Sequence, residues 1–390
     1  MKKKDRNHID LLTLLAVLIL MVMSLGVVYS ASSTWAYMKW NDTDKLLGSH
    51  AVKVLLGFLA IFIFMHIDYT LYRKITKPMM IAGVVLLLGT LAMGGEVKGA
   101  SRWLHLGGMS FQPSEFAKYA LIFHLSALIA HKKVQVQEFK TGYLPLLIWI
   151  GVVSLLVLLQ PNFSTGAMIV AISLVMLYVG QARLKHIALS FSAIIPLLLV
   201  YMLSAEYRMR RIMSFIQEHG GGEKPNYQLW QGIIGFGNGG VFGLGPGGSH
   251  QRDLFLPESY GDFVFSIVGE EYGLVGTIFI IGVFLLIMLR GIKIAKHARD
   301  DFGRLLALGI TTAVTLYGLV NAGVTLGVLP TTGLPMPFVS YGGSSMLFSA
   351  IAIGVLLNIS SQTDMHPRLD PTPGGVRPVE QGQPAVGKVY

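Results

Sequence analysis

Cysteine is absent from this chain of 390 residues, and charged residues are scarce. The lack of cysteine excludes disulfide bonds, thiolate-bound metals and a cysteine nucleophile. Charged residues make up 13% of the chain, about half of the ~25% typical of soluble domains, whereas hydrophobic residues make up 53%. This composition indicates a protein whose solvent is lipid.

The hydrophobic residues form long continuous runs, which predict membrane helices and not the alternating strands of a barrel. A span needs roughly 20 apolar residues. The first run is too long for the apolar core of a signal peptide, so we expect it to remain as a helix. We predict an all-α polytopic membrane protein of about ten transmembrane helices with one large extracytoplasmic loop. The predicted spans are 11–30, 48–68, 79–94, 114–130, 142–160, 164–180, 186–204, 263–289, 304–325 and 343–360.

The basic residues lie in short clusters between the apolar runs, which is a signal of orientation and not the basic stripe of a nucleic-acid-binding protein. With a cytoplasmic N-terminus, the short cytoplasmic loops hold thirteen Lys and Arg residues and the short outer loops hold four. Both termini are therefore expected in the cytoplasm. We expect a cytoplasmic N-terminus (1–10), one membrane domain (11–362) with its extracytoplasmic loop (205–262), and a disordered Pro/Gly-rich cytoplasmic tail (363–390).

A polar motif precedes the predicted fourth span. Pro113 suits the first turn of a helix, where its missing N–H leaves no donor unsatisfied. Glu115 and Lys118 are three residues apart and share one face of that helix at the membrane rim. They form either a structural ion pair or part of a functional site, because ionisable side chains within a membrane helix are costly.

The long outer loop contains two further patterns. Arg208 and Arg211 fall on one face of an amphipathic segment, which is typical of an interfacial helix that rests on headgroups or takes part in binding. The run Gly235-Phe-Gly-Asn-Gly-Gly lacks the preceding strand of a dinucleotide-binding fingerprint. We expect its glycines to allow close approach of the backbone to a ligand.

The loop ends in Leu256-Pro-Glu258-Ser-Tyr-Gly-Asp262, where the chain re-enters the bilayer. Partial desolvation at such a boundary makes a carboxylate a stronger base. Aspartate is also a favoured N-cap, so Asp262 is either the cap of the eighth span or a catalytic base. The segment from Leu329 through Ser340 carries three prolines, and irregular backbone at membrane depth indicates the wall of a cavity.

The chain resembles the SEDS family of shape, elongation, division and sporulation proteins (FtsW, RodA and SpoVE) over roughly residues 10–362. The resemblance rests on motifs that occur in one order: Arg102-Trp103, Gln112-Pro-Ser-Glu-x-x-Lys118, the glycine-rich run before Leu256-Pro-Glu, Asp262-Phe with Gly269-Glu-Glu, and Phe338-Val-Ser-Tyr-Gly-Gly-Ser-Ser. Tyr29-Ser-Ala-Ser-Ser and Gly237-Asn-Gly-Gly-Val-Phe-Gly-Leu-Gly are more similar to the division members than to RodA.

The resemblance implies a peptidoglycan glycosyltransferase that polymerises lipid II at the outer face of the bacterial cytoplasmic (inner) membrane, at the division septum. It implies that Asp262 is the catalytic carboxylate. The implied partners are lipid II, a cognate class B penicillin-binding transpeptidase, other division proteins and the membrane, with no nucleic acid. The chain has Asn162 and Gly261 where the family often has Asp and Thr, which makes an essential anion at position 162 doubtful.

The residue types suit this chemistry. A polyprenyl diphosphate leaving group needs cations, and an acceptor hydroxyl needs one base, so a single carboxylate suffices. Mg²⁺ or Mn²⁺ could bridge the diphosphate, and no organic cofactor is expected. The candidate substrate-binding residues are Arg102, Glu115, Lys118, Arg208, Arg211, Glu258 and Ser340.

Three alternatives stay open: a lipid II flippase or other transporter, a RodA-like polymerase for cell elongation, and a non-catalytic scaffold for a transpeptidase. Transporters usually bind their substrate near the bilayer midplane. The polar motifs here gather on one side of the membrane, which favours chemistry at the surface.

Overall fold

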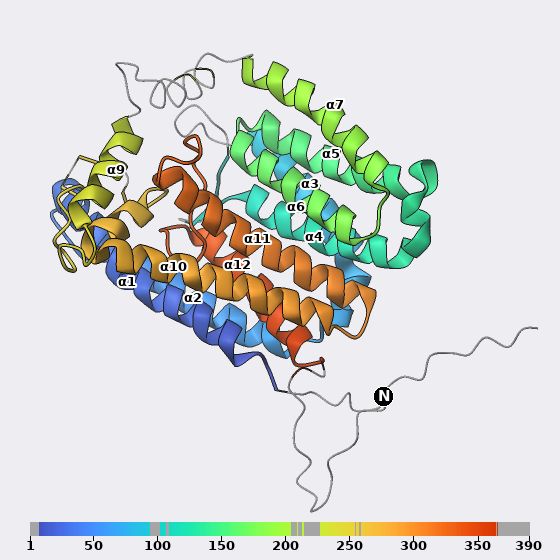
Figure 1. Cartoon of the computed structure of the whole chain (residues 1–390), viewed down its shortest axis with the longest axis horizontal. Coiled ribbons are helices and arrows are strands. Elements are labelled where there is room, and N and C mark those ends of the chain that lie inside the picture. The colour runs from blue at the N-terminus through green and yellow to red at the C-terminus, as the bar shows by residue number, and fades with distance from the viewer. Residues whose placement is uncertain are drawn as a thin grey trace, which may run out of the picture.

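A computed structural model of the chain describes residues 8–93, 102–106, 109–203, 209, 213, 227–253, 255–256, 259–363 and 365. Within these residues, ten long helices form an antiparallel bundle (Figure 1). They are α1 (Leu11–Trp40), α2 (Lys45–His66), α3 (Tyr72–Met93), α4 (Pro113–Lys132), α5 (Leu144–Leu159), α6 (Phe163–Val179), α7 (Leu184–Leu203), α10 (Val264–Lys296), α11 (Asp301–Thr325) and α12 (Gly343–Ser360).

Each predicted span coincides with one of these helices, and seven of the helices are long and apolar enough to cross a membrane. The other three are α4, which carries the charged pair, and the apolar helices α6 and α7. The main boundary difference is α1, which continues to Trp40 where the prediction ended at 30. Periodicity cannot set this end, because the last turns of α1 contact the long loop. Thr34 Oγ1 donates to Asp253 Oδ1 at 2.7 Å, and the ring centroids of Trp35 and Tyr260 are 5.4 Å apart.

Several shorter elements connect the bundle helices. The turns are η1 (Tyr69–Leu71), η2 (Lys133–Gln137) and the π-helical η3 (Phe139–Tyr143), and the long loop contains one helix, α9 (Tyr227–Gly239). The chain is not purely helical, since strands β1 (Leu104–Leu106) and β2 (Met109–Phe111) pair as an antiparallel hairpin with Leu104 opposite Phe111. Strands of three residues are too short to produce a visible alternation in the sequence.

The two ends of the bundle differ in character. One end, called the loop end from here on, gathers α9, the hairpin and the start of α12; there Gln112 N donates to Ser344 Oγ at 3.0 Å. At the opposite end, Arg290 Nε donates to Asp10 Oδ1 at 3.1 Å, and Asp10 N donates to Ser360 Oγ at 3.0 Å. The described polar motifs before α4 and at the start of α12 therefore lie together at the loop end.

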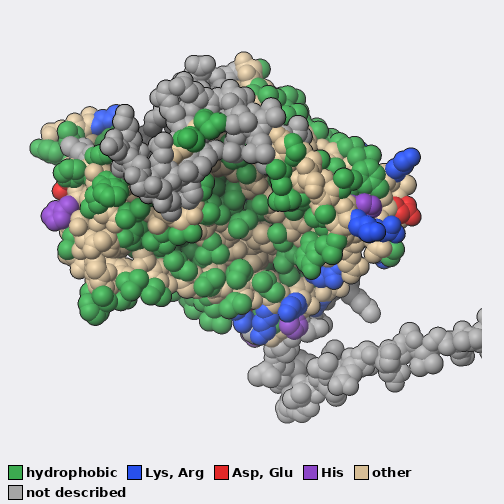
Figure 2. All heavy atoms as spheres, turned by 45° about the horizontal axis from the view of Figure 1, so that its top comes forward, with side chains coloured by type: hydrophobic (Ala, Val, Ile, Leu, Met, Phe, Trp, Pro, Cys, Tyr) green, Lys and Arg blue, Asp and Glu red, His purple; other side chains and the backbone are tan. Residues whose placement is uncertain are grey.

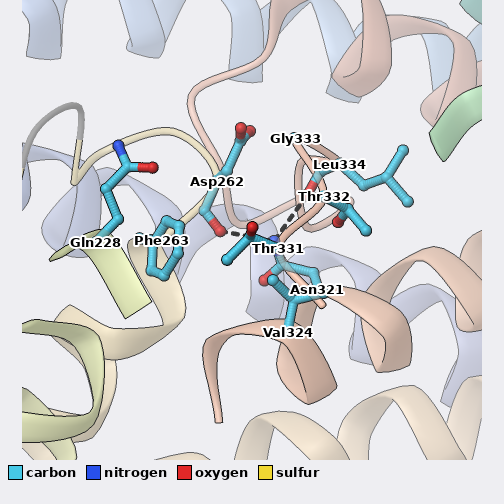
Figure 3. Close-up of a pocket in the computed structure, with 9 residues that line it drawn as sticks. All are labelled: Gln228, Asp262, Phe263, Asn321, Val324, Thr331, Thr332, Gly333 and Leu334. Atoms are coloured by element: carbon cyan, nitrogen blue, oxygen red, sulfur yellow. Dashed lines mark hydrogen bonds between the residues drawn. The ribbon is translucent and has the colours of Figure 1, made fainter. Parts of the chain in front are cut away.

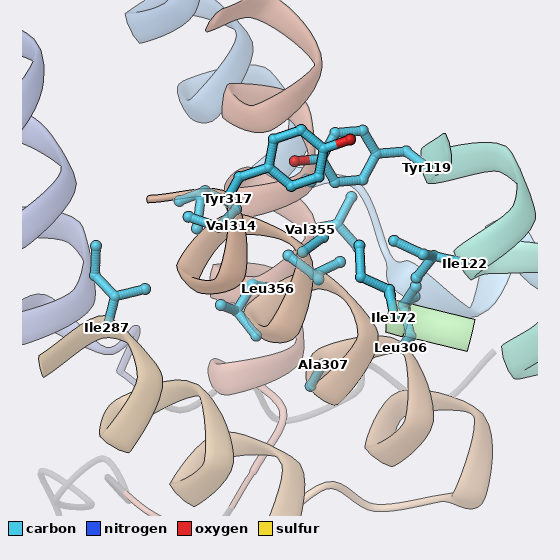
Figure 4. Close-up of a cluster of buried hydrophobic side chains, with 14 of the residues drawn as sticks. Tyr119, Ile122, Ile172, Ile287, Leu306, Ala307, Val314, Tyr317, Val355 and Leu356 are labelled. Carbon is cyan, nitrogen blue, oxygen red and sulfur yellow. The ribbon is translucent and has the colours of Figure 1, made fainter. Parts of the chain in front are cut away.

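The core and the surface of the bundle are both apolar. Figure 4 shows side chains from α4, α6, α10, α11 and α12 meeting at its centre, with the rings of Tyr119 and Tyr317 close together. In Figure 2, hydrophobic side chains cover most of the visible body, whereas Lys and Arg side chains concentrate mainly toward one side. A soluble protein does not expose an apolar surface of this extent, so this surface faces lipid.

Candidate functional site

Asp262 lies in a small cavity at the loop end (Figure 3). The cavity has a volume of about 70 Å³ and is formed by α9, the start of α10, the end of α11 and the loop that follows α11. Its lining residues are Gln228, Asp262, Phe263, Asn321, Val324, Thr331, Thr332, Gly333 and Leu334. A Cβ atom on Gly333 would lie 3.4 Å from Oδ2 of Asp262, so the backbone of this loop passes beside the carboxylate.

Asn321 fixes the backbone on both sides of this cavity. Its Nδ2 donates to the carbonyl oxygens of Asp262 and Leu334, each at 2.7 Å, and the residue is 1% exposed. Figure 3 shows the Asp262 carboxylate pointing away from these two bonds. The clamp therefore sets the position of Asp262 through its main chain and leaves the carboxylate to face the cavity.

Asn321 was not among the site residues predicted from the sequence, although the sequence carries a signal for it. It is an asparagine within the apolar span 304–325, and a polar side chain at such a position is expensive unless it has a partner. Its partner carbonyls belong to irregular segments whose fold the sequence does not reveal.

The structure separates the two interpretations of Asp262. Helix α10 begins at Val264, and its N-cap residue is Phe263. Asp262 therefore lies one residue before the cap position. Asp262 is thus not the residue at the N-cap position of α10.

The glycine-rich run packs on α10, and its predicted approach to a ligand stays a prediction. Its first residues belong to α9, and the following turn bonds to α10 through Leu244 N and the carbonyl of Glu270 at 3.0 Å. Gly273 interrupts α10 with a φ of 63°, and a Cβ there would lie 2.5 Å from Gly243 N. Gly239, Gly243 and Gly273 are thus required where two backbones touch.

Glu270 and Glu271 are almost completely buried beneath this run, at 0% and 1% exposed. Glu270 accepts hydrogen bonds from Gln251 N at 3.1 Å and from the Ser249 hydroxyl. Glu271 accepts one from the Ser30 hydroxyl of α1. Glu270 thus connects the long loop to the bundle, and Glu271 connects α10 to α1. The Gly-Glu-Glu motif therefore supports the part of the bundle on which the loop before Asp262 packs.

Glu115 and Lys118 form an ion pair at the start of α4, and Pro113 occupies its first turn as predicted. Lys118 Nζ lies 2.8 Å from Glu115 Oε2, and each side chain is 2% exposed. The ammonium also lies 3.9 Å from the ring centroid of Tyr317. The pair is not part of the Asp262 cavity lining, and its role in substrate binding stays a prediction.

Arg102 and Ser340 support irregular backbone at the loop end. The Arg102 guanidinium donates to the carbonyls of Gln160, at 3.2 Å from Nε, and of Pro161. Ser340 Oγ accepts from Met336 N at 2.9 Å within the loop after α11. Asn162, at the N-cap position of α6, makes no side-chain capping bond.

Arg208, Arg211 and Glu258 lie outside the described residues, so their predicted roles stay predictions. Within the part of the chain that the structure describes, no group of three or more His, Asp or Glu side chains could hold a metal ion. A cation that bridges the substrate diphosphate also stays a prediction.

Comparison with known proteins places these features in a family. Residues 10–365 match the family described as "Cell cycle protein", which comprises FtsW, RodA and SpoVE. The chain is 37% identical over 361 residues to a probable peptidoglycan glycosyltransferase FtsW of Geobacter metallireducens, covering 92% of this chain and 96% of that protein. It is 36% identical over 355 residues to stage V sporulation protein E of Bacillus subtilis, covering 90% and 96%.

Solved structures of similar fold support the same family assignment. A chain in a structure on polymerisation and crosslinking by a peptidoglycan synthase complex superposes with a TM-score of 0.73 at 25% identity, covering 90% of this chain and 97% of that chain. An aspartate-to-alanine mutant of RodA from Thermus thermophilus gives a TM-score of 0.67 at 25% identity, with the same coverage. The chain belongs to the FtsW, RodA and SpoVE family of multi-pass membrane proteins.

Proposed function

We propose that the chain is a peptidoglycan glycosyltransferase of the division type that polymerises lipid II, with Asp262 as its general base. The observation that carries the proposal is the placement of Asp262. This carboxylate lies in a cavity at the loop end, beside backbone that a buried asparagine fixes in place. The curated relatives that are named peptidoglycan glycosyltransferases support the activity.

The reaction needs one base and one cationic region. The acceptor hydroxyl oxygen attacks C1 of the donor sugar, and its proton passes to the Asp262 carboxylate. The bond between C1 and the diphosphate oxygen breaks, and the lipid diphosphate leaves with the electron pair. A positioned base contributes roughly 10²–10⁴-fold to the rate.

The cavity is smaller than a disaccharide site, since pockets for ligands of that size have volumes of roughly 300 Å³ or more. It therefore accounts for the reacting groups and not for the whole substrate. The sugars would extend over the loop end, and the prenyl chain would lie in lipid beside the bundle. This arrangement suits a substrate that stays anchored in the membrane.

The proposal includes the orientation of the chain and a partner. The charge bias of the short loops supports a loop end outside the cytoplasmic membrane, with septal localisation following from the division type. Labelling of a cysteine at position 250 in this cysteine-free chain tests the orientation. The relative in a peptidoglycan synthase complex supports assembly with a class B transpeptidase.

Asp262→Asn tests the base directly. The variant keeps the shape of the side chain, so thermal stability in detergent should change little while glycan synthesis from purified lipid II falls by about 10²-fold or more. Asp253→Asn is a matched control at the loop end, because Asp253 accepts from Thr34 Oγ1 at 2.7 Å and is not in the cavity lining. Near-normal polymerisation by Asp262→Asn, with or without the transpeptidase, would refute the assignment. Lipid II translocation without polymerisation by the wild type would instead identify a flippase.

A further inference from the structure

Lys53 places a positive charge inside a membrane helix. It is the ninth residue of α2, which is 22 residues long and apolar enough to span a membrane. A charged side chain at such a depth is expensive and indicates a functional role. Among the residues that the structure describes, no carboxylate forms an ion pair with Lys53.

The side chain is held against the start of α12. Lys53 Nζ lies 3.4 Å from the ring centroid of Tyr341, and a Cβ on Gly343 would lie 3.4 Å from Lys53 Cε. The Tyr341 hydroxyl is 3.0 Å from Ser49 Oγ, one turn earlier on α2. The aromatic ring stabilises the ammonium electrostatically but supplies no counter-charge.

This cluster is connected to the Asp262 segment. Tyr341 N donates to the carbonyl of Tyr260 at 3.0 Å, and the two rings meet edge to face with centroids 5.6 Å apart. Tyr260 precedes Asp262 by two residues. Lys53 thus stands behind the same loop that carries the proposed base.

Lys53 is partly exposed, and its neighbours Val52 and Leu56 are exposed apolar side chains. Helix α2 packs on α1 and α12, whereas α3 packs on α4 and α5. The surroundings of the partly exposed ammonium are therefore lipid and the loop end. A ligand suited to this position combines an anionic headgroup with an apolar chain.

Two other described cations at the loop end are already engaged. The Arg102 guanidinium donates to two backbone carbonyls, and Lys118 is paired with Glu115. Lys53 has an aromatic neighbour and no carboxylate among the described residues. A lysine ammonium is a compact point charge suited to phosphate oxygens.

We propose that Lys53 binds a phosphate of a prenyl diphosphate lipid, in an anion site between α2 and the start of α12. The proposal rests on the function proposed above, because that reaction uses and releases such a lipid. The chemistry recognised is a lipid phosphate, which the diphosphate lipid or an ordinary anionic phospholipid can supply.

The test measures binding of undecaprenyl diphosphate to the full-length chain in nanodiscs of neutral phosphatidylcholine. Lys53→Met removes the charge and keeps most of the stem, and the loss of a hydrogen bond to a charged group should weaken binding by about tenfold or more. Lys53→Arg keeps the charge and should stay within about threefold of the wild type. Lys45→Met, at the exposed start of the same helix and over Trp40, is the matched control and should bind as the wild type does.

Two further measurements separate binding from a structural role. Added salt should weaken binding to the wild type much more than to Lys53→Met, and binding of uncharged undecaprenol should be the same for both. Equal affinities of wild type and Lys53→Met for the diphosphate, or an equal loss for undecaprenol, would overturn the proposal. Displacement of the diphosphate by phosphatidylglycerol at equal concentration would overturn its assignment to prenyl diphosphates.

The binding assay requires no polymerisation. A chain that bound the diphosphate through Lys53 but made no glycan would contradict the proposed function and support the anion site. Polymerisation of lipid II by the wild type, together with normal diphosphate binding by Lys53→Met, would support the proposed function and contradict the anion site.

Discussion

Separating the two charges of the Glu115–Lys118 pair should be far more costly than removing both. The two side chains are each 2% exposed, with Nζ and Oε2 2.8 Å apart. Removal of one partner leaves a buried charge, which costs about 3–5 kcal/mol. The ammonium also contacts the Tyr317 ring, and a buried contact of this type contributes about 2 kcal/mol.

These contacts predict an asymmetry between the two single variants. Lys118→Met loses the ion pair and the ring contact, so it should destabilise the protein by about 5–7 kcal/mol in total. Glu115→Gln keeps the ammonium over the ring and should cost about 3–5 kcal/mol. The double variant contains no charge, so it should be more stable than Lys118→Met alone.

Unfolding in detergent, measured for the four members of this double-mutant cycle, gives the coupling energy. We expect it to exceed the cost of Glu115→Gln alone, about 3–5 kcal/mol, because the double variant should be more stable than Lys118→Met. Arg304 and Asp301 form a matched control pair at the same helical spacing, 3.3 Å apart but 39% and 50% exposed. Their cycle should give only 0.2–1 kcal/mol, roughly the range for exposed pairs. Additive effects of Glu115→Gln and Lys118→Met, or equal coupling in the two cycles, would refute the reasoning.

Three other changes test the supports of the loop end and of the opposite end. Asn321→Leu leaves two carbonyls without a hydrogen-bond donor, so it should lower stability by about 2 kcal/mol or more and also lower the turnover of the folded fraction. Asn358→Leu, at the opposite end, should lower stability alone. Equal turnover by Asn321→Leu and the wild type would show that the clamp does not position the proposed base. Gly273→Ala should cost about 2 kcal/mol or more because its φ is 63° and a Cβ meets backbone, while Gly282→Ala, with nothing within 4 Å, should be neutral or stabilising in the same melt. Burial alone would raise the pKa of Asp10, but hydrogen bonds from Arg290 and Thr13 hold that pKa below the ordinary 3.8. The stabilisation of the folded state by the Asp10 carboxylate is therefore present above pH 3.8 and is lost as pH falls through the folded-state pKa. The difference in melting temperature between wild type and Asp10→Asn should accordingly shrink on acidification, and a difference that stays constant with pH would contradict this assignment.

The order of the helices could be predicted because each span is a long apolar run with a polar break on either side. Pro113 and Glu115 were placed correctly for the same reason, since a proline followed by an acidic residue is a local signal of a helix start. Asp262 was placed at the re-entry of the chain from composition alone. Local patterns were sufficient wherever one element determined the position of a residue.

Predictions were incomplete where two distant segments determine a position. The glycines between 239 and 245 meet the backbone of α10 around Gly273, and only the packed structure shows which surface they approach. Asn321 donates to the carbonyl of Asp262, which lies 59 residues away in the sequence. Lys53 was absent from the predicted set of cations because α2 reads as an ordinary apolar span, and its contact with Tyr341 joins residues far apart in sequence.

Several described polar side chains at the loop end share one physical task, which explains how the carboxylate of the proposed base can be placed there. Irregular backbone near lipid leaves carbonyl and N–H groups that no helix or sheet satisfies. In this chain Asn321 bonds the carbonyls of Asp262 and Leu334, and the Ser259 hydroxyl bonds the carbonyl of Ala31 at 2.7 Å. Once these groups have hydrogen-bond partners, the loops can stay irregular without adopting a regular helix. The Asp262 carboxylate can then point into a cavity rather than into a helix cap, which is what a base for an external hydroxyl requires.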